Sequence, residues 1–207
     1  MPNALEIGPA AIDASAVAIL AHGRGGSPED MAELARQLDR PRFRFVLLRA
    51  PNHTWYPNRF TAPIASNEPF LSQALAAYAA AIEDVLAAGV PLSRLVVGGF
   101  SQGACLTGGL LWQRSARYGG VVMFTGGLIG PPGTIWPPQP GLKDVPVLLT
   151  CGDRDDWIPL PRVEETANAL EASGARVQKR IYPGRPHLIS DDEIVLARAL
   201  LDGAAAS

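Results

Sequence analysis

Residues 99–103 read Gly-Phe-Ser-Gln-Gly, and they stand where an apolar, valine-containing run (94–100) passes directly into a stretch of helical pattern (102–114). A G-x-S-x-G motif between a strand and a helix is typical of a nucleophile elbow, whose glycines let the two elements approach closely. A serine hydroxyl becomes a good nucleophile only when a base removes its proton. We therefore predict Ser101 as a nucleophile with partners elsewhere in the chain; the alternative is a serine that only caps the helix.

Strand-like and helix-like segments alternate along the chain. Several of the strand-like runs are apolar throughout, as parallel strands buried on both faces should be. The expected strands are 16–21, 43–49, 94–100, 120–124, 145–151 and 177–182. The expected helices are 28–38, 69–88, 102–114, 160–173 and 191–201, the first with Ser27 as its N-cap. This alternation predicts an α/β fold with a mostly parallel, doubly wound sheet.

Length and composition fit a single domain over residues 1–207. The chain is 47% hydrophobic and 18% charged, which is enough apolar material for a sizeable core. Its 18 basic and 20 acidic residues give a net charge of -2 without long runs of one sign, which argues against nucleic-acid binding. Residues 1–8 lack a signal-peptide pattern, and we expect no segment of membrane-spanning length. The default expectation is a cytoplasmic protein without integral membrane association.

The partners of Ser101 should follow later strands. Reactive groups gather at the carboxyl ends of parallel strands, and the expected order along the chain is serine, acid, histidine. His187 is the histidine that lies C-terminal to Ser101, in a Pro/Gly turn after the strand 177–182. We predict His187 as the general base; the alternative is a surface histidine in a turn.

The acid is expected after the strand 145–151. Asp153, Asp155 and Asp156 all follow it, and each could accept a hydrogen bond from His187. Spacing favours Asp155, because Asp153 lies close enough to the strand end to cap the turn. The other two aspartates would then serve the turn and the positive end of the next helix.

Two backbone N–H groups are expected to stabilise the oxyanion. Gln102 supplies one, because it follows the nucleophile in the elbow. The second should come from the loop after an early strand, which reads His-Gly-Arg-Gly-Gly at 22–26, and we assign it to the Arg24 N–H. We expect His22 to anchor this loop. The loop fits neither phosphate-binding pattern, so phosphate binding is the minor alternative.

Together these residues resemble the α/β-hydrolases, and more narrowly the phospholipase/carboxylesterase family, which includes bacterial carboxylesterases and acyl-protein thioesterases. The resemblance covers about residues 17–200 and rests on the motifs at 22–25, 99–103, 152–159 and 182–187. It implies a compact α/β-hydrolase fold without a cap domain. It also implies Asp155 as the acid and Arg24 and Gln102 as the oxyanion donors.

The chain departs from the family pattern at two places. Cys151 stands where the family usually has histidine, and the segment 55–60 is unlike the corresponding loop of the acyl-protein thioesterases. Aromatic residues in the loop-like stretches 51–67 and 130–141 are expected to line an acyl pocket or to pack those loops onto the sheet. These substrate-binding candidates are Trp55, Tyr56, Phe60 and Trp136, with Trp157 beyond them.

The implied activity is hydrolysis of short- to medium-chain carboxylic esters or thioesters through an acyl-enzyme, with lysophospholipase activity within the family's range. The chemistry needs no metal and no organic cofactor, and the partner is a small-molecule substrate. Two alternatives stay open: a non-catalytic scaffold that binds a ligand or partner protein, and an amidase or peptidase with the same triad. If the protein forms oligomers, a symmetric homodimer is expected, because this is the commonest oligomeric state of soluble proteins.

Overall fold

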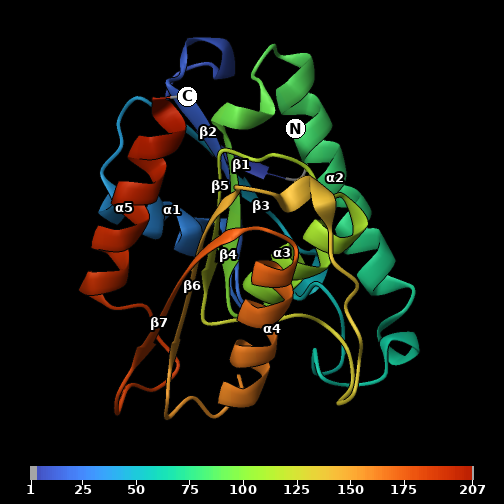
Figure 1. The fold of residues 1–207 in the computed structure, drawn as a ribbon. Coiled ribbons are helices and arrows are strands. Elements are labelled where there is room, and N and C mark those ends of the chain that lie inside the picture. The colour runs from blue at the N-terminus through green and yellow to red at the C-terminus, as the bar shows by residue number, and fades with distance from the viewer. Residues whose placement is uncertain (1–3, 207) are drawn as a thin grey trace.

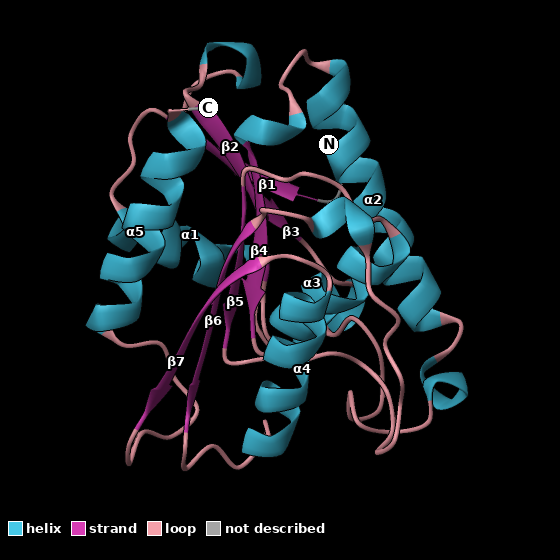
Figure 2. Cartoon of the chain, viewed as in Figure 1, coloured by secondary structure: helices cyan, strands magenta, loops and turns pink. Residues whose placement is uncertain are grey.

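The apolar segments of the chain form a central sheet. The computed structural model describes residues 4–206, and within them seven strands pair in the order β1-β3-β2-β4-β5-β6-β7. The strands are β1 (Ala4–Ile7), β2 (Ala16–Ala21), β3 (Phe43–Leu48), β4 (Leu95–Phe100), β5 (Gly120–Phe124), β6 (Pro146–Gly152) and β7 (Arg176–Tyr182). Strands β2 to β7 are parallel, and β1 runs antiparallel to β3. The predicted mostly parallel α/β sheet is confirmed (Figure 2).

Helices cover both faces of the sheet (Figure 1). They are α1 (Pro28–Leu38), α2 (Phe70–Ala87), α3 (Gln102–Gln113), α4 (Leu160–Ala172) and α5 (Asp191–Ala205). Helices α1 and α5 pack on one face and α2, α3 and α4 on the other, and each face buries its own apolar cluster. The predicted cap of α1 is present: the Ser27 side chain accepts from the Asp30 N–H, and the Asp30 carboxylate accepts from the Ser27 N–H.

Strand β1 was not predicted from the sequence. It has only four residues, Ala-Leu-Glu-Ile, and four residues are too few to show a clear strand pattern in the sequence. In the structure each of them is only partly buried, at the edge of the sheet. The other strand and helix boundaries lie within one residue of the prediction, except that α5 continues to Ala205. The two long loop-like stretches contain three short 3-10 turns: Pro51–His53, Ile64–Asn67 and Pro140–Leu142. No inserted cap appears in the described residues.

Helix α2 is long and apolar enough to contradict the expectation that no segment has membrane-spanning length. By length and composition alone it could cross a membrane, although a core helix of a folded protein passes the same test. In the structure Tyr78 of α2 is fully buried, and its hydroxyl lies 3.0 Å from the carbonyl oxygens of Ile19 and Gly98. These contacts fasten α2 to the neighbouring strands β2 and β4.

The parallel strands bring four loops to one end of the molecule. The carboxyl ends of β2, β4, β6 and β7 all lie at the lower edge in Figure 1. The loops that follow them carry, in the same order, the predicted oxyanion loop, the elbow, the aspartate cluster and His187.

Candidate active site

The elbow places Ser101 in a strained backbone conformation. Its φ of 55° and ψ of -119° lie outside the regions that side-chain-bearing residues ordinarily adopt. The Ser101 N–H donates to the Phe124 carbonyl at 3.0 Å, which anchors the turn to β5. A Cβ on Gly103 would lie 2.0 Å from the Ala21 oxygen, and one on Gly99 would lie 2.5 Å from the same atom. Both glycines are therefore required for α3 to approach β2 and β4 this closely.

The structure brings Ser101, His187 and Asp155 together. The Ser101 Oγ lies 2.8 Å from His187 Nε2, and His187 Nδ1 lies 2.7 Å from Asp155 Oδ2. Both contacts are satisfied when the neutral imidazole carries its proton on Nδ1, so that Nε2 accepts from the serine hydroxyl. The imidazole is 20% exposed and the Asp155 side chain is fully buried. The arrangement can transfer the serine proton to histidine while the carboxylate stabilises the resulting imidazolium.

The backbone of its own loop fixes the Asp155 carboxylate. Its Oδ1 accepts from the N–H groups of Trp157 and Ile158, both at 2.8 Å, which leaves Oδ2 for His187. Asp153 has a different contact: its Oδ1 accepts from the Gly184 N–H at 2.6 Å and so joins the acid loop to the histidine loop. Asp156 is exposed. Of the three aspartates, the structure therefore brings Asp155 to the histidine.

A buried ion pair supports the histidine loop, and sequence reasoning missed it. Arg185 pairs with Glu193, and Arg185 also donates to the Leu188 carbonyl on the far side of His187. Glu193 accepts from the Thr150 hydroxyl of β6 as well. The Ser190-x-x-Glu193 spacing, a capping box at the start of α5, could have indicated Glu193; no local signal pointed to Arg185.

The two predicted oxyanion donors are available. Within the described residues, neither the Arg24 N–H nor the Gln102 N–H donates to a protein acceptor. His22 holds the loop that carries Arg24: its Nδ1 lies 2.7 Å from the Gly23 oxygen and its Nε2 accepts from the Ala50 N–H at 3.2 Å. Burial lowers the pKa of His22, which favours the neutral imidazole that the acceptor contact at Nε2 requires.

The side chains of Arg24 and Gln102 have a further role that was not predicted. They tie the oxyanion loop and the elbow to the segment 54–58. The terminal nitrogens of Arg24 donate to Thr54 Oγ1 at 3.1 Å and to the carbonyls of Tyr56, Pro57 and Asn58 at 2.9, 2.9 and 2.7 Å. Gln102 donates to the Tyr56 carbonyl at 2.8 Å and accepts from the Trp55 N–H at 3.0 Å. The two side chains thus form hydrogen bonds with backbone groups of an irregular loop that in a helix or sheet would bond to other backbone groups.

A pocket of about 530 Å³ opens beside Ser101 and His187. Tyr56, Phe60 and Trp157 line it, as expected for substrate-binding residues. Trp55 and Trp136 lie outside the lining, which corrects the sequence interpretation. The Trp55 indole is buried and donates to the His22 carbonyl at 2.8 Å. The Trp136 indole donates to the Ile129 carbonyl at 3.3 Å, so both tryptophans pack loops.

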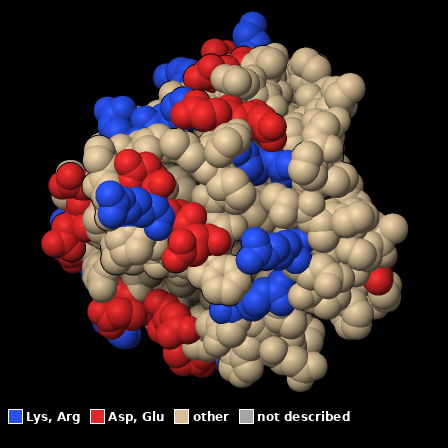
Figure 3. Space-filling model, turned by 90° about the horizontal axis from the view of Figure 1, so that it is seen from below, with Lys and Arg blue, Asp and Glu red and all other residues tan. Residues whose placement is uncertain are grey.

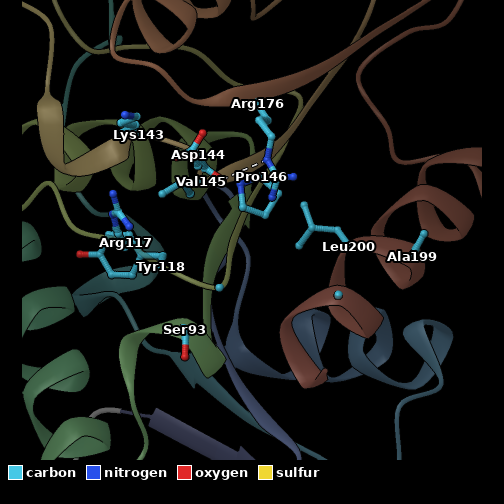
Figure 4. Close-up of a pocket in the computed structure, with 12 residues that line it drawn as sticks. Ser93, Arg117, Tyr118, Lys143, Asp144, Val145, Pro146, Arg176, Ala199 and Leu200 are labelled. Carbon is cyan, nitrogen blue, oxygen red and sulfur yellow. Dashed lines mark hydrogen bonds between the residues drawn. The ribbon is translucent and has the colours of Figure 1, made fainter. Parts of the chain in front are cut away.

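A second hollow of about 350 Å³ lies at the opposite, amino end of the strands (Figure 4). Residues just before or at the start of β5, β6 and β7 line it, including the exposed cations Arg117, Lys143 and Arg176. None of the candidate catalytic residues reaches it. Within residues 4–206, no group of three or more His, Cys, Asp or Glu side chains is placed to hold a metal ion. The pocket beside Ser101 is therefore the candidate active site.

The sequence profile of the phospholipase/carboxylesterase family matches residues 3–202. The chain belongs to this family. A phospholipase/carboxylesterase from Dyadobacter fermentans is 36% identical and has a TM-score of 0.89, with 96% of this chain and 95% of that one covered. An acyl-protein thioesterase 1 from Eremothecium gossypii is 29% identical over 209 residues, covering 89% of this chain and 87% of its own. A Bacillus cereus carboxylesterase, 21% identical with a TM-score of 0.76 over 97% of this chain and 94% of its own, shares the fold.

Membership of the phospholipase/carboxylesterase family confirms the resemblance inferred from the sequence. The chain is an α/β-hydrolase of the carboxylesterase and acyl-protein thioesterase type. The family description and the name of the thioesterase relative both indicate a hydrolase of the ester type.

Proposed function

We propose that this protein is a serine hydrolase that cleaves short- to medium-chain carboxylic esters or thioesters. The observation that carries the proposal is the pair of contacts through His187, at 2.8 Å to the Ser101 hydroxyl and at 2.7 Å to the Asp155 carboxylate. A nucleophile, a base and an orienting acid at hydrogen-bond distances form the constellation used for acyl transfer.

In the first half-reaction Ser101 Oγ attacks the substrate carbonyl carbon and its proton passes to His187 Nε2. The negative charge that develops on the carbonyl oxygen is stabilised by the N–H groups of Arg24 and Gln102. When the tetrahedral intermediate collapses, His187 gives the proton to the leaving alcohol or thiol, and the acyl group remains on Ser101. Water then attacks the acyl-enzyme with His187 again as base, which releases the carboxylic acid and restores the serine.

The size and lining of the pocket support a substrate of short to medium length. A space of about 530 Å³ must hold both the acyl part and the leaving group. Phe60 and Ile158 supply apolar wall, while Cys105 on α3 lies one helical turn after Ser101 and also lines the pocket. The same triad could support an amidase or peptidase, and a ligand-binding scaffold would keep the pocket without turnover.

Hydrolysis of a p-nitrophenyl ester series from acetate to long acyl chains tests the proposal. Ser101→Ala should abolish turnover, whereas Ser93→Ala, the same change in the distant hollow, should retain it. A parallel series of thioesters and anilides would rank ester, thioester and amide leaving groups. Turnover that survives in Ser101→Ala would reject Ser101 as the nucleophile. No turnover of any ester by the wild-type protein would reject a serine esterase and favour the scaffold interpretation.

A cytoplasmic location and a symmetric homodimer remain predictions from the sequence. Fractionation of the native cells tests the location. Sedimentation equilibrium of the purified protein tests the assembly, because a dimer doubles the mass of the 21.9 kDa chain.

A further inference from the structure

The lining of the active-site pocket carries an unbalanced positive charge. Arg24 and Arg59 line it, and no Asp or Glu among the described residues does. Since a cation at a binding surface attracts anionic ligands, the question is which of these two guanidinium groups can reach a substrate.

The protein engages both terminal nitrogens of the Arg24 guanidinium. Its two terminal nitrogens carry four hydrogens, and they meet four acceptors: the Thr54 hydroxyl and the carbonyls of Tyr56, Pro57 and Asn58. A substrate anion could bind this guanidinium through two N–H groups only by breaking contacts that hold the loop. The Arg24 side chain is therefore assigned to holding the loop, while its backbone N–H remains the proposed oxyanion donor.

Arg59 is differently placed. Its side chain is exposed at the pocket, and its guanidinium carbon lies 5.7 Å from the centroid of the Trp157 ring. Within residues 4–206 it pairs with no carboxylate. A cation–π contact with an indole restricts a guanidinium without using its N–H groups as hydrogen-bond donors to a carboxylate.

The backbone that carries Arg59 is fixed on both sides. The buried Asn67 side chain accepts from the Asn58 N–H at 2.8 Å and donates to the Arg59 carbonyl at 3.2 Å. The Gly130 N–H donates to the Phe60 carbonyl at 2.9 Å. Arg59 is thus presented by an ordered segment next to the wall residue Phe60, so less entropy is lost when it binds a ligand.

Both signs of charge are present on the face of the molecule that carries the carboxyl ends of the strands. Figure 3 shows basic side chains near the centre of this face, with acidic ones along its upper part and toward the side of α5. Asp191 and Asp192 in the first turn of α5 belong to that side. The two arginines of the pocket lining are therefore the local charges that favour the approach of an anion.

We propose that the enzyme selects esters or thioesters that carry a carboxylate or phosphate group, with Arg59 as the residue that binds this anion. The proposal rests on the esterase function argued above and names its substrate class. Arg59 contributes a charge-assisted hydrogen bond with a planar fork that matches either anion.

Two matched substrate pairs test it. Mono-p-nitrophenyl adipate and p-nitrophenyl hexanoate differ by a terminal carboxylate on the acyl part. 4-Acetoxybenzoate and phenyl acetate differ by a carboxylate on the leaving group. For each pair the readout is the ratio of kcat/KM for the anionic ester to that for the neutral ester, which cancels general changes in activity.

We expect Arg59→Gln to lower this ratio about tenfold in at least one pair, mainly through KM, and Arg59→Glu to lower it further. Arg59→Lys should retain part of the preference. Arg117→Gln makes the same change of charge in the distant hollow and should leave the ratio within about twofold of the wild type. Raising the salt concentration to about 0.5 M should weaken the wild-type preference, because the interaction is partly exposed.

An unchanged ratio in Arg59→Gln for both pairs, or an equal fall in Arg117→Gln, would overturn the assignment of Arg59. Turnover of the neutral esters that is lost in Ser101→Ala would still support the proposed function in that case. If no ester of either pair is hydrolysed by the wild-type protein, the proposed function and the inference built on it are both rejected.

Discussion

The Arg185 guanidinium and the Glu193 carboxylate form a buried ion pair directly behind the loop that carries His187. Arg185 is 8% exposed and Glu193 is fully buried. Removing two charges from water is unfavourable, so a buried ion pair contributes little net stability. Its role is better explained by the loop that it holds in place. That loop sets the position of the imidazole: Arg185 precedes His187 by two residues and also holds the carbonyl of Leu188, which follows it.

Glu193→Gln should therefore lower both stability and turnover. The amide leaves the buried Arg185 without a counter-charge, which is expected to reduce the free energy of unfolding by about 3 kcal/mol. It also loosens the His187 loop, so kcat should fall more than KM rises. Chemical denaturation and steady-state kinetics on a neutral ester measure the two effects. Asp192→Asn, the same change on the exposed neighbour, is the control, and equal behaviour of the two variants would contradict a positioning role.

Asp155→Asn should reduce ester turnover by about 10³ to 10⁴. The carboxamide can no longer hold the imidazole in the tautomer that accepts the serine proton, nor stabilise the imidazolium. Asp153→Asn removes a charge two residues away but keeps an oxygen for the Gly184 N–H, so its loss should be smaller than about tenfold. Comparable losses in kcat/KM, or the reverse order, would show that Asp155 is not the acid.

Arg24→Lys should lower kcat/KM for neutral and anionic esters alike. A lysine ammonium cannot reproduce the four contacts of the guanidinium, so the segment 54–58 and the loop that presents the Arg24 N–H become less ordered. We expect a loss of about tenfold on both members of each substrate pair. A selective loss on anionic esters would instead identify Arg24 as a ligand of the substrate.

The two cysteines should be unreactive in the folded protein. Cys105 and Cys151 are both free and buried, and burial raises the pKa of each thiol to about 12. At pH 8 only about one thiol in 10⁴ is then ionised, and the thiolate is the reactive form. Ellman's reagent should label neither cysteine in the native state and both after unfolding in guanidinium. Rapid labelling of native protein, or loss of activity with iodoacetamide, would contradict this.

Most of the fold could be predicted from the sequence, because several of the parallel strands are apolar runs and strand-like and helix-like segments alternate. Strand β1 could not be predicted, because its own sequence pattern is weak and the strand is formed by pairing with β3. In the same way, Trp55 and Trp136 could not be told from pocket residues, because an aromatic side chain in a loop serves either purpose until its neighbours are known.

The sequence by itself determined the α/β-hydrolase fold, the family and the order of the candidate residues Ser101, Asp155 and His187, because those depend on local turns and on strands that end at one edge. Only the tertiary structure decided which long polar side chains are held by hydrogen bonds within the protein. Arg24 and Arg59 look alike in the sequence, yet the terminal nitrogens of Arg24 meet four acceptors, whereas Arg59 contacts the Trp157 ring at the pocket. That difference depends on where distant loops place their carbonyl groups, and no local pattern encodes it.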